Sequence, residues 1–128
     1  MENKDCANIK KCLKIIEIDE FSEMIKQESF RKKWFANKEL AAELTYGKIQ
    51  SLAARYMIKL AISEIITGYN EYTEIEIANQ SNGKPYLVFG DLLHKKMKRN
   101  GIHNIQISIS HTRYLAAGLV VVNYNSKE

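Results

Sequence analysis

Long apolar segments are missing from this chain of 128 residues. No apolar run approaches the roughly 18 residues that a membrane-spanning helix needs, which argues against a membrane protein of that class. The charged start, MENKDCANIKK, also lacks the apolar core of a signal peptide. We therefore expect a cytoplasmic protein.

Cysteine and strong charge are also scarce. The two cysteines, Cys6 and Cys12, have no histidine or further cysteine near them in the sequence, so we expect reduced thiols and no zinc site. The net charge of +4 permits an acidic partner without demanding nucleic acid. The densest basic run, from His94 to Arg99, contains no aromatic residue, which argues against binding single-stranded nucleic acid. That run is either a solvated surface or a dock for an anion or an acidic protein.

The composition is otherwise typical of one globular domain. Charged residues make up 27% of the chain, and its length suffices to bury a core. The polar start predicts a flexible extension over residues 1–11, followed by a single domain over residues 12–124.

The most apolar stretch runs from Gln50 to Gly68 and contains no proline and no internal glycine. Its apolar residues cover most of a helix circumference, which predicts a buried central helix. Gly68 is placed to end that helix in a left-handed cap. A narrow polar stripe remains, and we expect it to reach water at a cleft or to face a partner. The stripe consists of Ser51, Arg55, Lys59 and Ser63.

Strand patterns surround this helix. A short segment rich in β-branched residues precedes it at 12–18, and three segments at 73–77, 85–89 and 105–110 follow, before an apolar run at 114–122. Asn82-Gly83 predicts a tight turn, and residues 111–113 predict a hairpin connection. Helices in the first half and strands in the second predict an α+β fold, with a mostly antiparallel sheet packed on the long central helix.

Four stretches, in the same order, resemble one known family. Ser108–Thr112 resembles its Ser-x-Ser/Thr-His-Thr hairpin, and Leu52–Lys59 resembles its Leu-Ala-x-Arg-Phe-x-x-Lys-Glu helix. Asn82–Pro85 matches its Asn-Gly-x-Pro turn, and Lys33–Leu40 resembles its Arg-x-Phe-Thr-x-x-Glu-Leu segment. The family is that of the holo-acyl-carrier-protein synthases, the small 4′-phosphopantetheinyl transferases.

This resemblance implies both a fold and an activity. The family moves phosphopantetheine from coenzyme A to a serine hydroxyl of an acyl carrier protein, and it holds Mg²⁺ on two carboxylates that neutralise the pyrophosphate. It assembles as a trimer with its clefts between subunits. The resemblance also places several residues beside the coenzyme, although a tight turn and a structural hairpin explain some of them equally well. These residues are Arg55, Lys59, Asn82, Gly83, Pro85, Ser110, His111 and Thr112.

The chain departs from the family pattern at positions that the resemblance assigns to metal binding and to carrier-protein binding. Lys14 stands in place of the metal-binding Asp, and Leu60 stands in place of the metal-binding Glu. Glu64 replaces a family Lys, and Glu20 replaces the family Arg that meets the acidic carrier protein. We therefore assign no metal ligands and do not expect Mg²⁺ to bind.

Two hypotheses follow. In the first, the protein is a catalytically impaired homologue that binds a carrier protein, a coenzyme A-like ligand or a partner enzyme, and serves fatty acid, polyketide or peptide assembly as an accessory subunit. In the second, it is an active transferase with a metal-poor site. Lys14 and Lys59 then neutralise the pyrophosphate, and Glu64, Glu17 or Asp19 does the acid–base work. Both hypotheses include a homotrimer.

Overall fold

The computed structural model describes residues 8–125. Cys6 and residues 1–7 of the expected extension lie outside the described residues. The elements are β1 (Ile9–Glu17), α2 (Ile18–Met24), α3 (Glu28–Trp34), the 3-10 turn η1 (Asn37–Leu40), α4 (Tyr46–Ile65), the 3-10 turn η2 (Tyr72–Glu74), β2 (Glu76–Asn79), β3 (Pro85–Val88), α5 (Asp91–Arg99), β4 (Ile102–His111) and β5 (Leu115–Tyr124).

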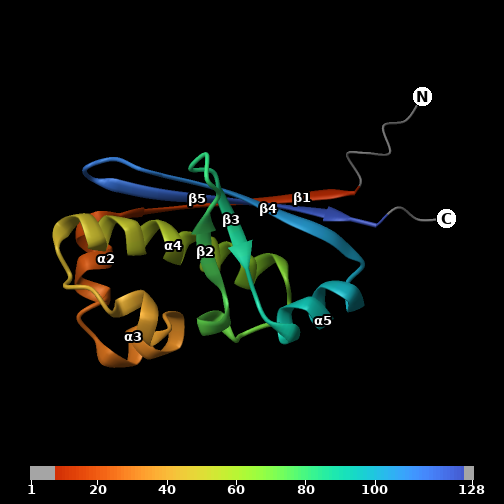
Figure 1. Ribbon diagram of the computed structural model, residues 1–128, viewed down its shortest axis with the longest axis horizontal. Coiled ribbons are helices and arrows are strands. Elements are labelled where there is room, and N and C mark those ends of the chain that lie inside the picture. The colour runs from red at the N-terminus through yellow and green to blue at the C-terminus, as the bar shows by residue number, and fades with distance from the viewer. Residues whose placement is uncertain (1–7, 126–128) are drawn as a thin grey trace.

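The main sheet has the strand order β1-β5-β4, and both pairings are antiparallel. It lies along one side of α4, and α2 and α3 lie on the other side, while the small β2-β3 sheet crosses α4 in this view and its strand β3 contacts β4 (Figure 1). Ile16, Ile107 and Val120 fill the space between the main sheet and the helix, because alternate strand residues face inward. The predicted α+β fold is confirmed.

Helix α4 is the predicted central helix, but it begins at Tyr46 rather than near Gln50. The Thr45 hydroxyl caps it by accepting a hydrogen bond from Lys48 N at 3.2 Å, which satisfies a free donor of the first turn. The helix ends at Ile65, and Gly68 adopts a φ of 86° shortly after it. The expected left-handed glycine is therefore present, three residues beyond the last helical residue.

Close packing of α4 on β5 depends on Gly118. A Cβ atom at this position would lie 2.9 Å from Ile58 N, which leaves no room for a side chain. Lys14 of β1 pairs with Gly118 in the sheet register. The helix consequently passes close to the inward-facing side chains of β1, including Lys14. The candidate site lies where these side chains meet the helix.

Strand β1 starts at Ile9, so the predicted start of the first strand at residue 12 is wrong by three residues. Ile9 and Lys11 pair with Asn123 and Val121 of β5. The backbone ladder extends into this polar stretch because Lys10 and Lys11 keep their side chains exposed. No helix among the described residues is long and apolar enough to cross a membrane.

Candidate functional site

Lys14 and Glu64 form an ion pair between the middle of β1 and the last turn of α4. Both side chains keep some contact with solvent, with 28% of Lys14 and 50% of Glu64 exposed. The hydrogen bond that Lys14 donates to Glu64 raises the pKa of the Lys14 ammonium. Of the predicted catalytic residues, the fold therefore brings these two together.

Cys12 lies beside this ion pair. Its thiol is 3.9 Å from Glu64 Oε1 and faces the same side of β1 as Lys14. Burial raises the pKa of the Cys12 thiol, and the charge of the Glu64 carboxylate raises it further, while Lys14 acts in the opposite direction. The group therefore consists of one cation, one carboxylate and one protonated thiol at neutral pH.

These residues do not fit Mg²⁺, which binds to several oxygen ligands in octahedral geometry. Glu64 supplies the single carboxylate and is already paired, Lys14 adds a positive charge, and Leu60 packs against the core one turn before Glu64. Across residues 8–125, no group of three or more His, Cys, Asp and Glu side chains is arranged to hold a metal ion. The chemistry available here is therefore charge pairing.

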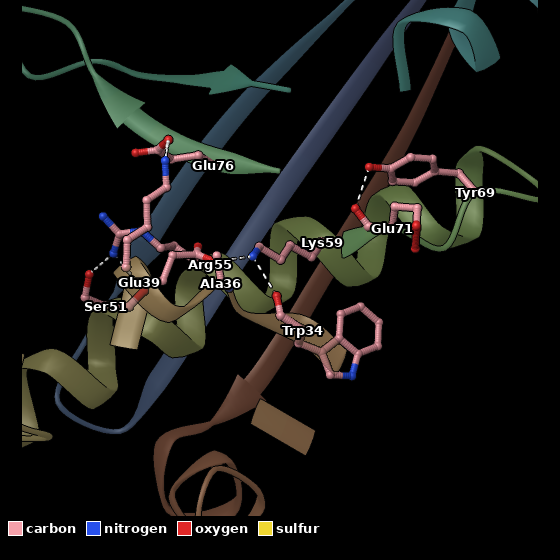
Figure 2. Close-up of polar contacts among 10 residues, drawn as sticks. Trp34, Ala36, Glu39, Ser51, Arg55, Lys59, Tyr69, Glu71 and Glu76 are labelled. Carbon is pink, nitrogen blue, oxygen red and sulfur yellow. Dashed lines mark hydrogen bonds and ion pairs between the residues drawn. The ribbon is translucent and has the colours of Figure 1, made fainter. Parts of the chain in front are cut away.

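Lys59, the third predicted catalytic residue, lies in the core, away from this pair. Its ammonium has no exposed surface and donates to Glu39 Oε1 at 2.8 Å and to the Trp34 carbonyl at 2.6 Å (Figure 2). Burial lowers its pKa, although the Glu39 charge opposes this shift. Glu39 Oε1 also accepts from Ala36 N at 2.8 Å, so the ion pair fastens η1 to α4. These contacts fit a structural role, and the predicted polar stripe does not reach water at Lys59.

Arg55 lines a cavity of about 190 Å³ between α4, η1 and β2. Its guanidinium donates to Ser51 Oγ, one turn earlier in the helix (Figure 2). Lys38 shares the cavity and pairs with Glu76 at 2.8 Å. Lys48 and Arg55 form no ion pair with any described residue, which leaves two cations free to meet an anion. Lys38 and Lys48 were not predicted as site residues from the sequence, because no motif singles them out.

The other predicted coenzyme contacts lie at two separate hairpins. Asn82, Gly83 and Pro85 form the β2-β3 turn, where Asn82 Oδ1 accepts from Lys84 N and Gly83 has a φ of 88°. Ser110 and His111 end β4, and Thr112 follows them in the connection to β5, where its Oγ1 accepts from Leu115 N at 3.1 Å. Figure 1 shows the two hairpins well apart, so a single chain does not bring them to one site. Their role in coenzyme binding stays a prediction.

Comparison with known proteins decides the family. No family model matches the chain. A holo-acyl-carrier-protein synthase from Fusobacterium nucleatum is 35% identical over 113 residues, which cover 84% of this chain and 93% of the relative. The chain belongs to the holo-acyl-carrier-protein synthase family. A second family member, from Halothermothrix orenii, is 33% identical over 116 residues, with 84% of this chain and 90% of the relative covered.

Solved structures of the holo-acyl-carrier-protein synthase family share the fold. The enzyme from Helicobacter pylori, crystallised with coenzyme A, has a TM-score of 0.71 at 22% identity, over 89% of this chain and all of that one. The enzyme from Neisseria meningitidis has a TM-score of 0.72 at 21% identity, over 91% and 97% of the two chains. In this chain, Lys14 and Glu64, two of the residues that depart from the resembled motifs, contact each other.

The Lys14–Glu64 contact predicts how Cys12 reacts. Replacing Glu64 with Gln removes a negative charge beside the thiol, so its pKa falls and alkylation by iodoacetamide at mildly alkaline pH becomes faster. Lys14→Met should have the opposite effect, since the ammonium lowers the thiol pKa. The rate is measured on the Cys12 peptide by mass spectrometry, with Glu28→Gln as a distant control. An unchanged rate in Glu64→Gln would contradict the contact.

Proposed function

We propose that this protein keeps the ligand-binding framework of a phosphopantetheinyl transferase but not its Mg²⁺ chemistry. It serves carrier-protein-dependent biosynthesis in the cytoplasm as a binding or accessory subunit. The observation that carries the proposal is the Lys14–Glu64 ion pair. Lys14 and Leu60 stand where the family motifs have metal-binding carboxylates, and Leu60 packs against the core. The Lys14 ammonium repels a divalent cation, and the Glu64 carboxylate is already paired with that ammonium, so these residues provide no site for Mg²⁺.

The cavity beside Arg55 supports coenzyme A as the ligand. Lys48 and Arg55 provide two uncompensated cations, and a guanidinium recognises phosphate oxygens through parallel hydrogen bonds. Relatives of this chain are named holo-acyl-carrier-protein synthases, and one similar structure contains coenzyme A. The relatives' name also supports an acyl carrier protein as the partner.

Calorimetry with coenzyme A tests the ligand. We expect binding of equal strength in Mg²⁺ and in EDTA, because no step of binding uses a metal. The double variant Lys48→Ala/Arg55→Ala should weaken binding by on the order of tenfold or more, since it removes charge-assisted hydrogen bonds. Lys32→Ala is the matched control, because Lys32 pairs only with Glu28 on the distant α3. Tight binding that depends on Mg²⁺ would overturn the proposal.

An active transferase is the second candidate, favoured by the Lys14 ammonium at the expected position of the metal. The arrangement gives it little support, since Lys14 is neutralised by Glu64 and Lys59 is enclosed with Glu39. Intact mass of an apo acyl carrier protein, incubated with coenzyme A and this protein, separates the two. We expect no gain of phosphopantetheine, while an authentic transferase produces it. A gain with the natural chain would establish the enzyme.

We further propose a homotrimer, which the resemblance implies and which the exposed face of the main sheet supports. Helix α4 is enclosed within the single chain, whereas the outer face of the main sheet leaves Leu13, Ile15 and Leu115 exposed by 58%, 59% and 43%. A second copy covering this face would remove that apolar surface from water. The separation of the two hairpins also suits a site completed between copies. Light scattering should give a trimer mass, and a monomer at working concentration would contradict the proposal.

A further inference from the structure

Helix α5 presents a basic outer surface. Leu93 and Met97 are buried, whereas His94, Lys95, Lys98 and Arg99 are exposed. No ion pair within residues 8–125 involves any residue of this helix. The helix dipole favours cations in the last turn, but it leaves their charge facing solvent. Leu92 lies on the same helix with 46% of its surface exposed, so the positive surface also has an apolar contact.

Three exposed lysines elsewhere in the chain already have an acidic partner. Lys26 pairs with Glu23, Lys32 with Glu28 and Lys38 with Glu76. The opposite end of α4 carries negative charge, because α2 exposes Asp19, Glu20 and Glu23. Unpaired positive charge is therefore dense on α5, whereas α2 exposes negative charge, and Figure 1 shows these two helices at opposite ends of α4. An acidic partner is attracted to α5 and repelled from α2.

The basic helix also adjoins the candidate site. Lys96 Nζ lies 3.1 Å from the place of a Cβ atom on Gly68, directly after α4. Glu64 stands one turn before that point, in the last turn of α4. A partner that docks on α5 therefore rests at the end of α4 that carries the Lys14–Glu64 pair.

We propose that the exposed face of α5 docks an acidic helical surface of an acyl carrier protein, with Leu92 as the apolar contact. This inference rests on the proposed function, since that function supplies the carrier protein as partner. Nucleic acid is disfavoured because no aromatic side chain is interleaved with the cations. A lipid surface is disfavoured because nine residues with one exposed leucine give too little apolar area to anchor a helix.

Surface plasmon resonance with an immobilised apo acyl carrier protein tests the docking. The triple variant Lys95→Glu/Lys98→Glu/Arg99→Glu should weaken binding by about tenfold or more, mostly through slower association. The matched control, Lys26→Glu/Lys32→Glu/Lys33→Glu, changes the net charge equally on α3 and the turn before it, and should alter affinity by less than about twofold. Asp19→Lys/Glu20→Lys should leave binding unchanged or strengthen it. Circular dichroism and coenzyme A calorimetry verify that each variant is folded.

Several results would overturn the inference while leaving the proposed function standing. One is equal weakening by the α5 variant and its control, which would mean attraction by net charge alone. A second is carrier binding that only the α2 variant abolishes. A third is binding of coenzyme A without any binding of the carrier protein. The same conclusion holds if duplex DNA or phosphatidylserine vesicles bind through α5 while the carrier protein does not. Loss of both coenzyme A and carrier binding in the natural chain would remove the proposed function, and the inference with it.

Discussion

Replacing Lys59 with methionine is expected to cost about 3–5 kcal/mol of folding stability, because it leaves the Glu39 carboxylate buried without its counter-charge. The ammonium is fully buried, lies 2.8 Å from Glu39 Oε1 and stands 4.8 Å from the centre of the Phe35 ring. Glu39 Oε2 is also buried and has no hydrogen-bond partner among the described residues. Lys59 is the one residue that forms an ion pair with this carboxylate among the described residues, so without Lys59 it must protonate, draw on the cations of the neighbouring cavity or unfold its surroundings.

Urea unfolding measures this loss, and a second variant separates its causes. Lys59→Met/Glu39→Met should recover most of the stability, since apolar residues of similar volume often replace a buried ion pair at little cost. The same double variant tests the predicted catalytic role. If Lys59 is structural, as its contacts indicate, the double variant still binds coenzyme A like the natural chain. A single Lys59→Met variant within about 1 kcal/mol of the natural stability would contradict the buried pair.

Reversing three residues at the candidate site should create Mg²⁺-dependent transfer. We expect Lys14→Asp/Leu60→Glu/Glu64→Lys to raise the rate by on the order of a hundredfold or more, because a bound metal lowers the barrier to phosphoryl-type transfer by several kcal/mol. All three changes are needed. With Lys14→Asp/Leu60→Glu alone, Glu64 would face two new carboxylates in place of its lysine, and like charges repel.

Intact mass of the carrier protein, with coenzyme A and either Mg²⁺ or EDTA, measures the gain. The natural chain and the two-residue variant are the controls, and coenzyme A calorimetry verifies the pocket. A gain in the triple variant that EDTA abolishes would show that catalysis was lost at these positions. No gain, with coenzyme A still bound, would contradict that account and direct attention to Glu20 on α2, where the family motif has an arginine.

Local patterns in the sequence determined most of the fold. The apolar circumference of residues 50–68 predicted a buried central helix, and α4 contains Leu52, Ile58 and Ile62 without exposed surface. Its early start at Tyr46 was missed, because Gly47 disfavours a helix and the Thr45 cap that offsets it is a weak signal. Most strand patterns held, because alternation of apolar residues reports directly which side of a sheet is buried. The segment predicted at 73–77 was partly wrong, since it begins as the 3-10 turn η2 and becomes β2 only from Glu76.

The sequence by itself determined the family, the elements and the residues that replace the expected carboxylates. Only the tertiary structure decided which of those residues meet. Along the chain, Lys14 and Glu64 look like two independent departures from the family motifs. In the structure they form one ion pair, because Gly118 allows α4 to pack closely on the sheet beside β1. Lys59 shares a sequence stripe with Arg55, yet a small rotation around the helix buries one and leaves the other at a cavity. Sequence spacing fixes which side chains share a face of one element, whereas contacts between elements depend on register and on how closely they pack.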